Sequence, residues 1–457
     1  MLKKEIVGFA RGLYGLRDFV DLIDPILNEK QKEIETSRQH LLDPVRRILT
    51  EKVVPDTNSE ETVDFDKDIV TPSNIKIEIV NETKGTEGET TALTFKVSGE
   101  DSHAFQETIN DLTRVQKRKN ILYQSSLMNL TNTVEWFLSQ ILHKYFETYP
   151  NAIGSKENVF SLDDLKGFNT IEDARQHLIE TKVENILRDN FDAWIKFLKE
   201  NVKLSMSYLE KNKSQIVEVF QRRNLIVHNG GKVNSIYLSK VVPEFKENVS
   251  IGDEILISRK YLDDSIGLFE EMFILIAAEL WKQQSPADED RATILAQIAY
   301  EHLSKERWRI AEGLSFFSTN DKGMSEIYQL YGKLNYWQSV KWQGRYEEIK
   351  KDVDNADFSG KGLLLQLALY ALQDKTSEFF RLLPEVISES VTPSFMGHKL
   401  TCEELETFPI FREMRKDPSY SEFKSENAGK FAAFSDASDQ ESADNEDVKD
   451  VESEVAH

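Results

Sequence analysis

Apolar residues recur along most of this 457-residue chain at three- and four-residue steps, the spacing of an amphipathic α-helix. Residues 1 to about 50 begin with this pattern. The stretches IKIEIV (75–80) and TALTFKV (91–97) instead alternate apolar and polar residues around a polar loop, which predicts a β-hairpin. Residues 1–104 are therefore expected to form an N-terminal helix and a small mixed α/β segment. The periodic apolar positions of the first helix are Ile6, Phe9, Leu13, Leu16, Val20 and Ile23.

The next segment, residues 105–285, carries helical periodicity almost throughout. Its beginning predicts one or two long helices that end before Pro150. Thr170 precedes Asp173 by three residues, which is close to a capping box and predicts the start of another helix. A later helix should stop at Gly230 and Gly231, because glycine readily adopts the left-handed backbone of a helix end. We expect one helical domain here.

Residues 287–425 change character and predict three helix pairs, each with a first helix rich in Leu, Ala and Tyr. An aromatic residue enters each second helix, at Trp308, Tyr346 and Phe380. This spacing suits stacked helical hairpins, and the pattern resembles degenerate tetratricopeptide repeats, which implies a surface for a protein partner. Residues 426–457 form an acidic stretch that predicts a disordered tail.

Composition narrows the possible partners. There are 57 basic and 79 acidic residues, a formal charge of −22, so a broad basic face for nucleic acid is not expected and any RNA contact must be local. One cysteine, Cys402, excludes an internal disulfide framework and fits the cytoplasm. No cofactor or metal cluster is expected. The sequence also predicts neither a signal peptide nor a membrane span.

The stretch RRNLIVHNGG (222–231) concentrates the candidate chemistry. Of the eight histidines, only His228 follows arginines at this spacing, with four residues between it and Arg223 and five between it and Arg222. RNA supplies its own nucleophile, the 2′-hydroxyl. Cleavage then needs a group that takes or gives a proton, a task for histidine, and a cation that holds the phosphate, a task for arginine. The expected products are a 2′,3′-cyclic phosphate and a 5′-hydroxyl.

Together with residues 168–198 (FNTIEDARQHLIETKVENILRDNFDAWIKFL), this stretch resembles the HEPN superfamily, an all-α group with many toxins and antiviral ribonucleases. Its hallmark is an R-x4–6-H motif, which Arg223, Asn224 and His228 match. The resemblance covers roughly residues 105–285. It implies a mainly α protein, a HEPN-like helical bundle plus α–α repeats, that acts as a metal-independent endoribonuclease in defence or growth arrest. It also implies a homodimer whose motifs meet across a two-fold interface.

Further candidates extend this site. In the family an acidic residue of an early helix sometimes joins the motif, and Glu135 is the candidate here. Arg222 and Asn229 are candidates for substrate binding. In a regular helix, Arg223 and His228 would point about 140° apart, because five residues turn about 500°. Either the helix end near the glycines is distorted, or a two-fold dimer brings both copies of each side chain to one cleft.

Structural interpretations of the same residues stay open. His228 is favoured by the dipole at a helix C-terminus, the two arginines can pair with Glu218, and Asn229 can simply end the helix. On that interpretation the chain is a non-catalytic dimeric adaptor, and its repeats bind protein. Cleavage of RNA in the presence of EDTA distinguishes the two classes of protein.

Overall fold

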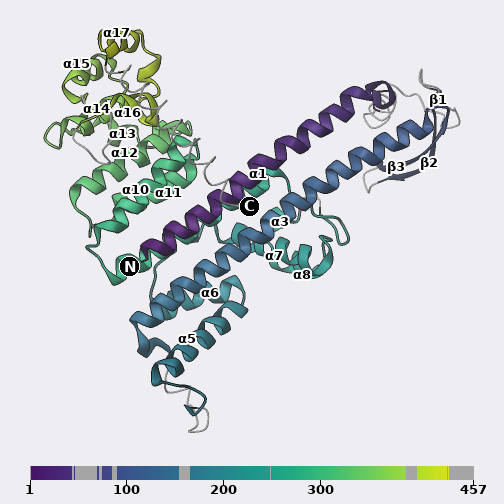
Figure 1. The fold of residues 1–457 in the computed structure, drawn as a ribbon, viewed down its shortest axis with the longest axis horizontal. Coiled ribbons are helices and arrows are strands. Elements are labelled where there is room, and N and C mark those ends of the chain that lie inside the picture. Colours follow the sequence, from purple (N-terminus) through teal and green to yellow (C-terminus); the bar gives the residue numbers. More distant parts are fainter. Residues whose placement is uncertain are drawn as a thin grey trace, which may run out of the picture. The chain divides into compact units, whose positions relative to one another are not determined.

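The structure, a computed structural model, describes residues 2–43, 46, 69–70, 75–84, 90–153, 165–247, 249–387, 399–429 and 431. For the strand residues up to 97 it describes the backbone alone. The protein is mainly α, as the periodicity predicted (Figure 1). Nearly all of the predicted acidic tail lies outside these residues. Within the ranges described, no helix is long and apolar enough to cross a bilayer.

The described residues fall into two compact units. The first unit draws on residues 1–13, 133–220 and 264–457, and the second on residues 14–132 and 221–263. Four helices contribute residues to both units: α1 (Lys3–Ser37), α3 (Ser102–Thr148), α7 (Lys213–Asn229) and α9 (Arg259–Gln284). The four-part division of the sequence stays a prediction, because compactness does not show which segments fold independently.

In the second unit, α1 and α3 run antiparallel (Figure 1). Near the end of α1, Arg38 pairs with Asp111 at 3.0 Å, whereas farther back Asp24 accepts a hydrogen bond from the Tyr123 hydroxyl. The order of these pairs along the two helices is reversed, as antiparallel packing requires. The predicted apolar stripe of α1 is largely buried, because every third or fourth residue faces the same side of a helix. α3 is a single helix that ends before Pro150, within the predicted range.

The same unit contains a small antiparallel sheet with strand order β1-β2-β3. Its strands are β1 (Ile69–Val70), β2 (Ile75–Lys84) and β3 (Thr90–Gly99). β2 and β3 pair in a register that places Ile77 opposite Val97, which confirms the predicted hairpin. The loop between them, residues 85–89, lies outside the described residues. The unit also holds α8 (Ser235–Lys240) and η4 (Pro243–Phe245).

An aromatic core organises the part of the first unit that precedes the helix pairs. Phe191 stacks against Phe220 with ring centroids 5.7 Å apart, and Phe220 meets Phe269 edge-on at 5.3 Å. The predicted capping box at Thr170 and Asp173 is present and begins α5. The elements here are η1 (Pro150–Ile153), α5 (Ile171–Arg188), α6 (Phe191–Phe197), η2 (Leu198–Val202) and η3 (Ser207–Leu209).

Helix pairs follow in the first unit, as predicted for residues 287–425. α10 (Glu289–Ser304) pairs with α11 (Trp308–Thr319), and α14 (Leu363–Leu372) pairs with α15 (Thr376–Val386). Between them lie α12 (Glu326–Trp342), η5 (Tyr346–Glu348) and α13 (Lys350–Asp354). The final elements are α16 (Cys402–Thr407), η6 (Pro409–Phe411), η7 (Met414–Lys416) and α17 (Pro418–Glu426).

The three pairs share one turn. A left-handed residue follows the first helix of each pair: Glu306 (φ 55°), Gly344 (φ 76°) and Asp374 (φ 55°). The next residue donates its amide to a carbonyl five positions back, so that Arg307 bonds His302, Arg345 bonds Val340 and Lys375 bonds Tyr370. These hydrogen bonds are those of a Schellman helix end.

The shared turn shows how the three pairs align. Trp308 and Tyr346 each stand two residues after their left-handed residue, but Thr376 holds that position in the third pair. Phe380 therefore lies four residues farther into α15 than the aromatic spacing suggested. The aromatic pattern identified the pairs but aligned the third one incorrectly. Whether the pairs belong to the tetratricopeptide class stays a prediction.

Candidate functional site

The candidate motif lies at the C-terminal end of α7, in the part of that helix that belongs to the second unit. Leu225 anchors this end in a small apolar cluster, where it is 3% exposed. Gly230 (φ 60°) and Gly231 (φ 77°) adopt the left-handed conformation, and the Gly231 amide donates to the Leu225 carbonyl at 3.0 Å. The predicted glycine stop is therefore confirmed. The cluster consists of Leu225, Val233, Tyr237, Val241 and Ile255.

Two extended segments support the helix end. Lys232 and Glu254 form an isolated antiparallel bridge, and the Ile255 amide donates to the Gly231 carbonyl at 2.8 Å. Asn234 then begins α8, because its side chain accepts a hydrogen bond from the Tyr237 amide at 2.9 Å. The residues around His228 are thus held by backbone hydrogen bonds on both sides of the glycine turn.

Arg222 is engaged in packing. Its Cζ lies 3.9 Å from the centre of the Tyr261 ring, and its Nη1 donates to the Leu256 carbonyl at 3.0 Å. The planar guanidinium is well suited to stack on an aromatic face while it donates hydrogen bonds in its own plane. These contacts favour the structural interpretation of Arg222. The motif alone could not predict Tyr261 or Leu256 as contacts of Arg222, because both residues are distant in the sequence.

Arg223 and Asn224 are half-buried neighbours on α7. The Arg223 Nη1 donates to the Asn224 Oδ1 at 3.2 Å. The Arg223 Nε is buried and has no hydrogen-bond partner among the described residues. An unsatisfied buried donor is costly, and native proteins seldom keep one without a reason. This guanidinium is therefore less completely engaged by the protein than that of Arg222.

His228 and Asn229 are exposed. The imidazole of His228 is open to solvent in the last turn of α7. The Asn229 side chain donates to the Lys232 carbonyl at 2.6 Å, so it helps to close the glycine turn. That contact supports a capping role for Asn229 and leaves His228 as the accessible polar side chain of the motif.

The path of α7 bears on how Arg223 and His228 could cooperate. The helix is regular from Lys213 to Asn229, and the left-handed residues come only after the motif. A distorted helix end therefore does not bring the two side chains together, and they remain about 140° apart around the axis. Of the two arrangements considered for the sequence, the pairing of two copies of the chain is the one compatible with this helix.

Glu135 belongs to the first unit, whereas Arg223 and His228 belong to the second. It is half-buried on α3, beside the exposed Trp136. Its assignment to the site stays a prediction. Among the described residues, no group of three or more His, Cys, Asp or Glu side chains is arranged to hold a metal ion.

No protein-family model, curated protein or solved structure matches this chain. The resemblance to the HEPN superfamily therefore rests on the motif and its helical context. Arg223, Asn224 and His228 carry it.

Proposed function

We propose that this chain is a metal-independent endoribonuclease of the HEPN type, in which His228 transfers protons and Arg223 holds the scissile phosphate. The observation that carries the proposal is the contrast between two adjacent arginines. Arg222 is packed against Tyr261, whereas Arg223 keeps an unsatisfied donor on the helix that presents the exposed His228. A phosphodiester supplies the negative oxygens that such a guanidinium binds.

The chemistry needs no group outside RNA and protein. The 2′-oxygen forms a bond to phosphorus while the bond from phosphorus to the 5′-oxygen breaks. One imidazole accepts the 2′-hydroxyl proton, and a second donates a proton to the departing 5′-oxygen. Arg223 stabilises the charge that develops on the phosphorane oxygens. The products are a 2′,3′-cyclic phosphate and a 5′-hydroxyl.

Two imidazoles imply two copies of the chain. Val227, directly before His228, is 47% exposed. The second unit also exposes Phe19, Leu22 and Ile26 by 51%, 65% and 56%, and their spacing places them on one face of α1. Apolar side chains exposed together on one helix face favour burial against a partner. A homodimer through this unit, acting in the cytoplasm in defence or growth arrest, is part of the proposal.

The test compares variants on a fluorophore-labelled RNA in EDTA. We expect His228→Ala and Arg223→Ala each to slow cleavage at least about 100-fold, as removal of a general acid–base or a phosphate-binding cation does. His103→Ala is the matched control, because His103 is an exposed histidine of the same unit outside the motif. The released ends should be cyclic phosphates. Equal cleavage by all four proteins would refute the proposal.

The dimer is tested separately. Leu22→Glu places a charge on the exposed face of α1, and we expect it to shift the sedimentation coefficient to that of a monomer and to abolish cleavage. Cleavage that persists in a monomeric variant would contradict the paired site.

The second candidate function is a non-catalytic adaptor. The packing of Arg222 and the hydrogen bond of Asn229 favour it, because they give two residues of the motif structural tasks. Absence of cleavage by folded, dimeric protein, together with capture of a protein partner that is lost when residues 287–425 are altered, would support it.

A further inference from the structure

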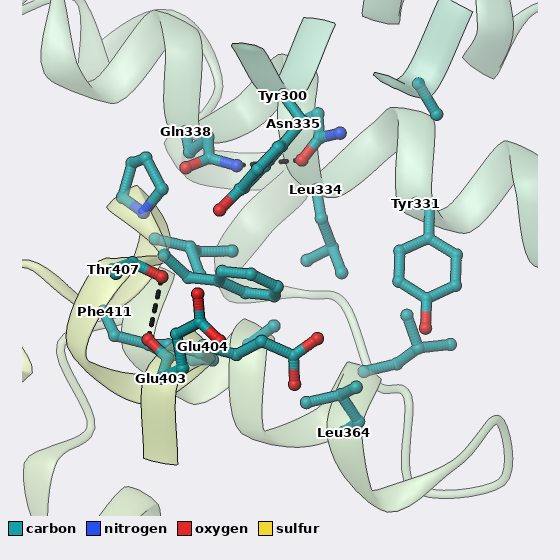
Figure 2. Close-up of a pocket in the computed structure, with 16 residues that line it drawn as sticks. Tyr300, Tyr331, Leu334, Asn335, Gln338, Leu364, Glu403, Glu404, Thr407 and Phe411 are labelled. Carbon is teal, nitrogen blue, oxygen red and sulfur yellow. Dashed lines mark hydrogen bonds between the residues drawn. The ribbon is translucent and has the colours of Figure 1, made fainter. Parts of the chain in front are cut away.

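A cavity of about 330 Å³ lies in the first unit, among α10, α12, α14 and α16 (Figure 2). Its size falls in the range of small-molecule sites, about 300–1,000 Å³. Apolar and aromatic side chains supply most of its wall, among them Tyr300, Tyr331, Phe408 and Phe411. The Tyr300 and Phe408 rings meet edge-on with centroids 5.2 Å apart. This cavity is distinct from the motif on α7 and goes beyond the proposed nuclease.

One polar group of the wall lacks a partner. Gln338 is 3% exposed, and its Nε2 donates to the Asn335 Oδ1 at 2.9 Å. In this orientation of the amide, the Gln338 Oε1 is buried with no hydrogen-bond partner among the described residues. A buried acceptor left unsatisfied costs about 1–3 kcal/mol. A ligand that brings a hydrogen-bond donor would remove this cost.

The charged side chains of the wall are both acidic. Glu403 and Glu404 come from α16, across the cavity from Gln338 and Asn335 (Figure 2). Glu404 is 6% exposed; its Oε2 accepts the Thr401 amide at 2.8 Å. Burial also raises the pKa of Glu404. Among the described residues that form the wall, none is Lys, Arg or His.

The hydroxyl groups of Tyr300 and Tyr331 are further polar groups of the wall. Burial, together with the charge of Glu404, raises the pKa of Tyr331 to about 12, so this hydroxyl stays protonated at neutral pH. The cavity thus offers acceptor oxygens, aromatic faces and a negative potential. A phosphate or carboxylate ligand would meet repulsion and no cation, whereas a positively charged group would meet attraction from both carboxylates and rings.

We propose that this cavity binds a small organic ammonium ion, an amine with an aromatic or aliphatic body. The N–H groups would donate to the Gln338 amide oxygen and to the α16 carboxylates, and the apolar body would fill the space between the aromatic side chains. An anionic ligand, including any nucleotide, is excluded by the same charges.

Calorimetry and ligand-observed NMR on the full chain test the charge preference. The probes are 2-phenylethylammonium, neutral 2-phenylethanol and anionic 3-phenylpropanoate, which share a ring and differ in charge. We expect the ammonium ion to bind at least about tenfold more tightly than either analogue, the difference that a charge-assisted hydrogen bond supplies. Equal or tighter binding of the alcohol or the carboxylate would overturn the proposal.

Three variants locate the binding, one of them a control outside the cavity. The double variant Glu403→Gln, Glu404→Gln should abolish the preference for the ammonium ion, and glutamine can still close the capping box at Thr401. Glu347→Gln, an exposed acid outside the cavity, should keep it. Ala368→Leu adds volume to the wall and should reduce binding of the ammonium ion. An ammonium preference that survives the double variant would refute the site. The readout is equilibrium binding, so it is independent of RNA cleavage.

Discussion

The two adjacent arginines of α7 should respond differently to truncation. Arg222→Ala removes the stacking on Tyr261 at 3.9 Å and the hydrogen bond to the Leu256 carbonyl at 3.0 Å. A cation–π contact at a half-exposed position contributes about 0.5–1 kcal/mol, and the hydrogen bond contributes about 1 kcal/mol. We therefore expect Arg222→Ala to lower the free energy of unfolding by about 1–2 kcal/mol.

Arg223→Ala should leave stability nearly unchanged. It removes one hydrogen bond to the neighbouring Asn224, and it also removes a buried Nε that has no acceptor. These effects oppose each other, so we expect a change within about 0.5 kcal/mol. Under the proposed function, RNA cleavage should nevertheless be lost.

Urea denaturation followed by circular dichroism measures both variants, and the RNA assay separates stability from activity. Arg222→Lys serves as an intermediate case, because lysine keeps the charge but lacks the planar group that stacks on Tyr261. An Arg223→Ala variant destabilised as much as Arg222→Ala would refute the distinction between a packed and a functional arginine.

Three further predictions concern the first unit, with one comparison variant, Gly15→Ala, in the second, and each is measured by chemical denaturation. Gly313→Ala should cost about 1–3 kcal/mol, because the added Cβ would lie 2.2 Å from the Glu271 Oε1, whereas Gly15→Ala, with open space around it, should be neutral or stabilising. Burial raises the pKa of Glu271 to about 7, so between about pH 4.5 and 7 the folded protein holds a proton that the unfolded chain has released. The free energy of unfolding should therefore fall as the pH rises through this range. Glu271→Gln should remove this pH dependence and stabilise the protein at pH 8 by roughly 2–3 kcal/mol. Glu306 and Gly344 both have left-handed backbone (φ 55° and 76°), which glycine adopts without strain. Glu306→Gly should therefore stabilise the protein by about 0.5–1 kcal/mol, and Gly344→Ala should destabilise it. A destabilised Glu306→Gly variant or a stabilised Gly344→Ala variant would disprove the role of the turn.

Local signals in the sequence predicted local structure well. The Thr170 box, the glycine stop after α7 and the β-hairpin are each set by residues that are neighbours in the chain, and the structure has all three. The helix pairs after residue 287 were also predictable, because each pair buries a periodic apolar face.

Contacts between distant residues could not be predicted. The stacking of Arg222 on Tyr261 depends on how the chain returns after Gly231, and no spacing rule encodes that path. The cavity is assembled from four helices, so the unsatisfied Gln338 has no signature in its own helix. The misalignment of Phe380 has a different, local origin. Glu306, Gly344 and Asp374 set the turns by backbone conformation and share no side-chain chemistry that a sequence pattern would reveal.

The shared turns also bear on how this region could change in evolution. The backbone hydrogen bonds that close each turn lie within its own hairpin. Side chains add links between hairpins, since the Lys341 Nζ of the second pair donates to the Leu372 carbonyl at 2.8 Å and to the Asp374 Oδ1 at 2.6 Å in the turn of the third. Duplication or deletion of a whole hairpin would therefore keep the backbone of every turn and change only side-chain links, whereas loss of a single residue inside a turn would rotate every later side chain about its helix axis. Homologous chains should consequently differ in length here by complete hairpins.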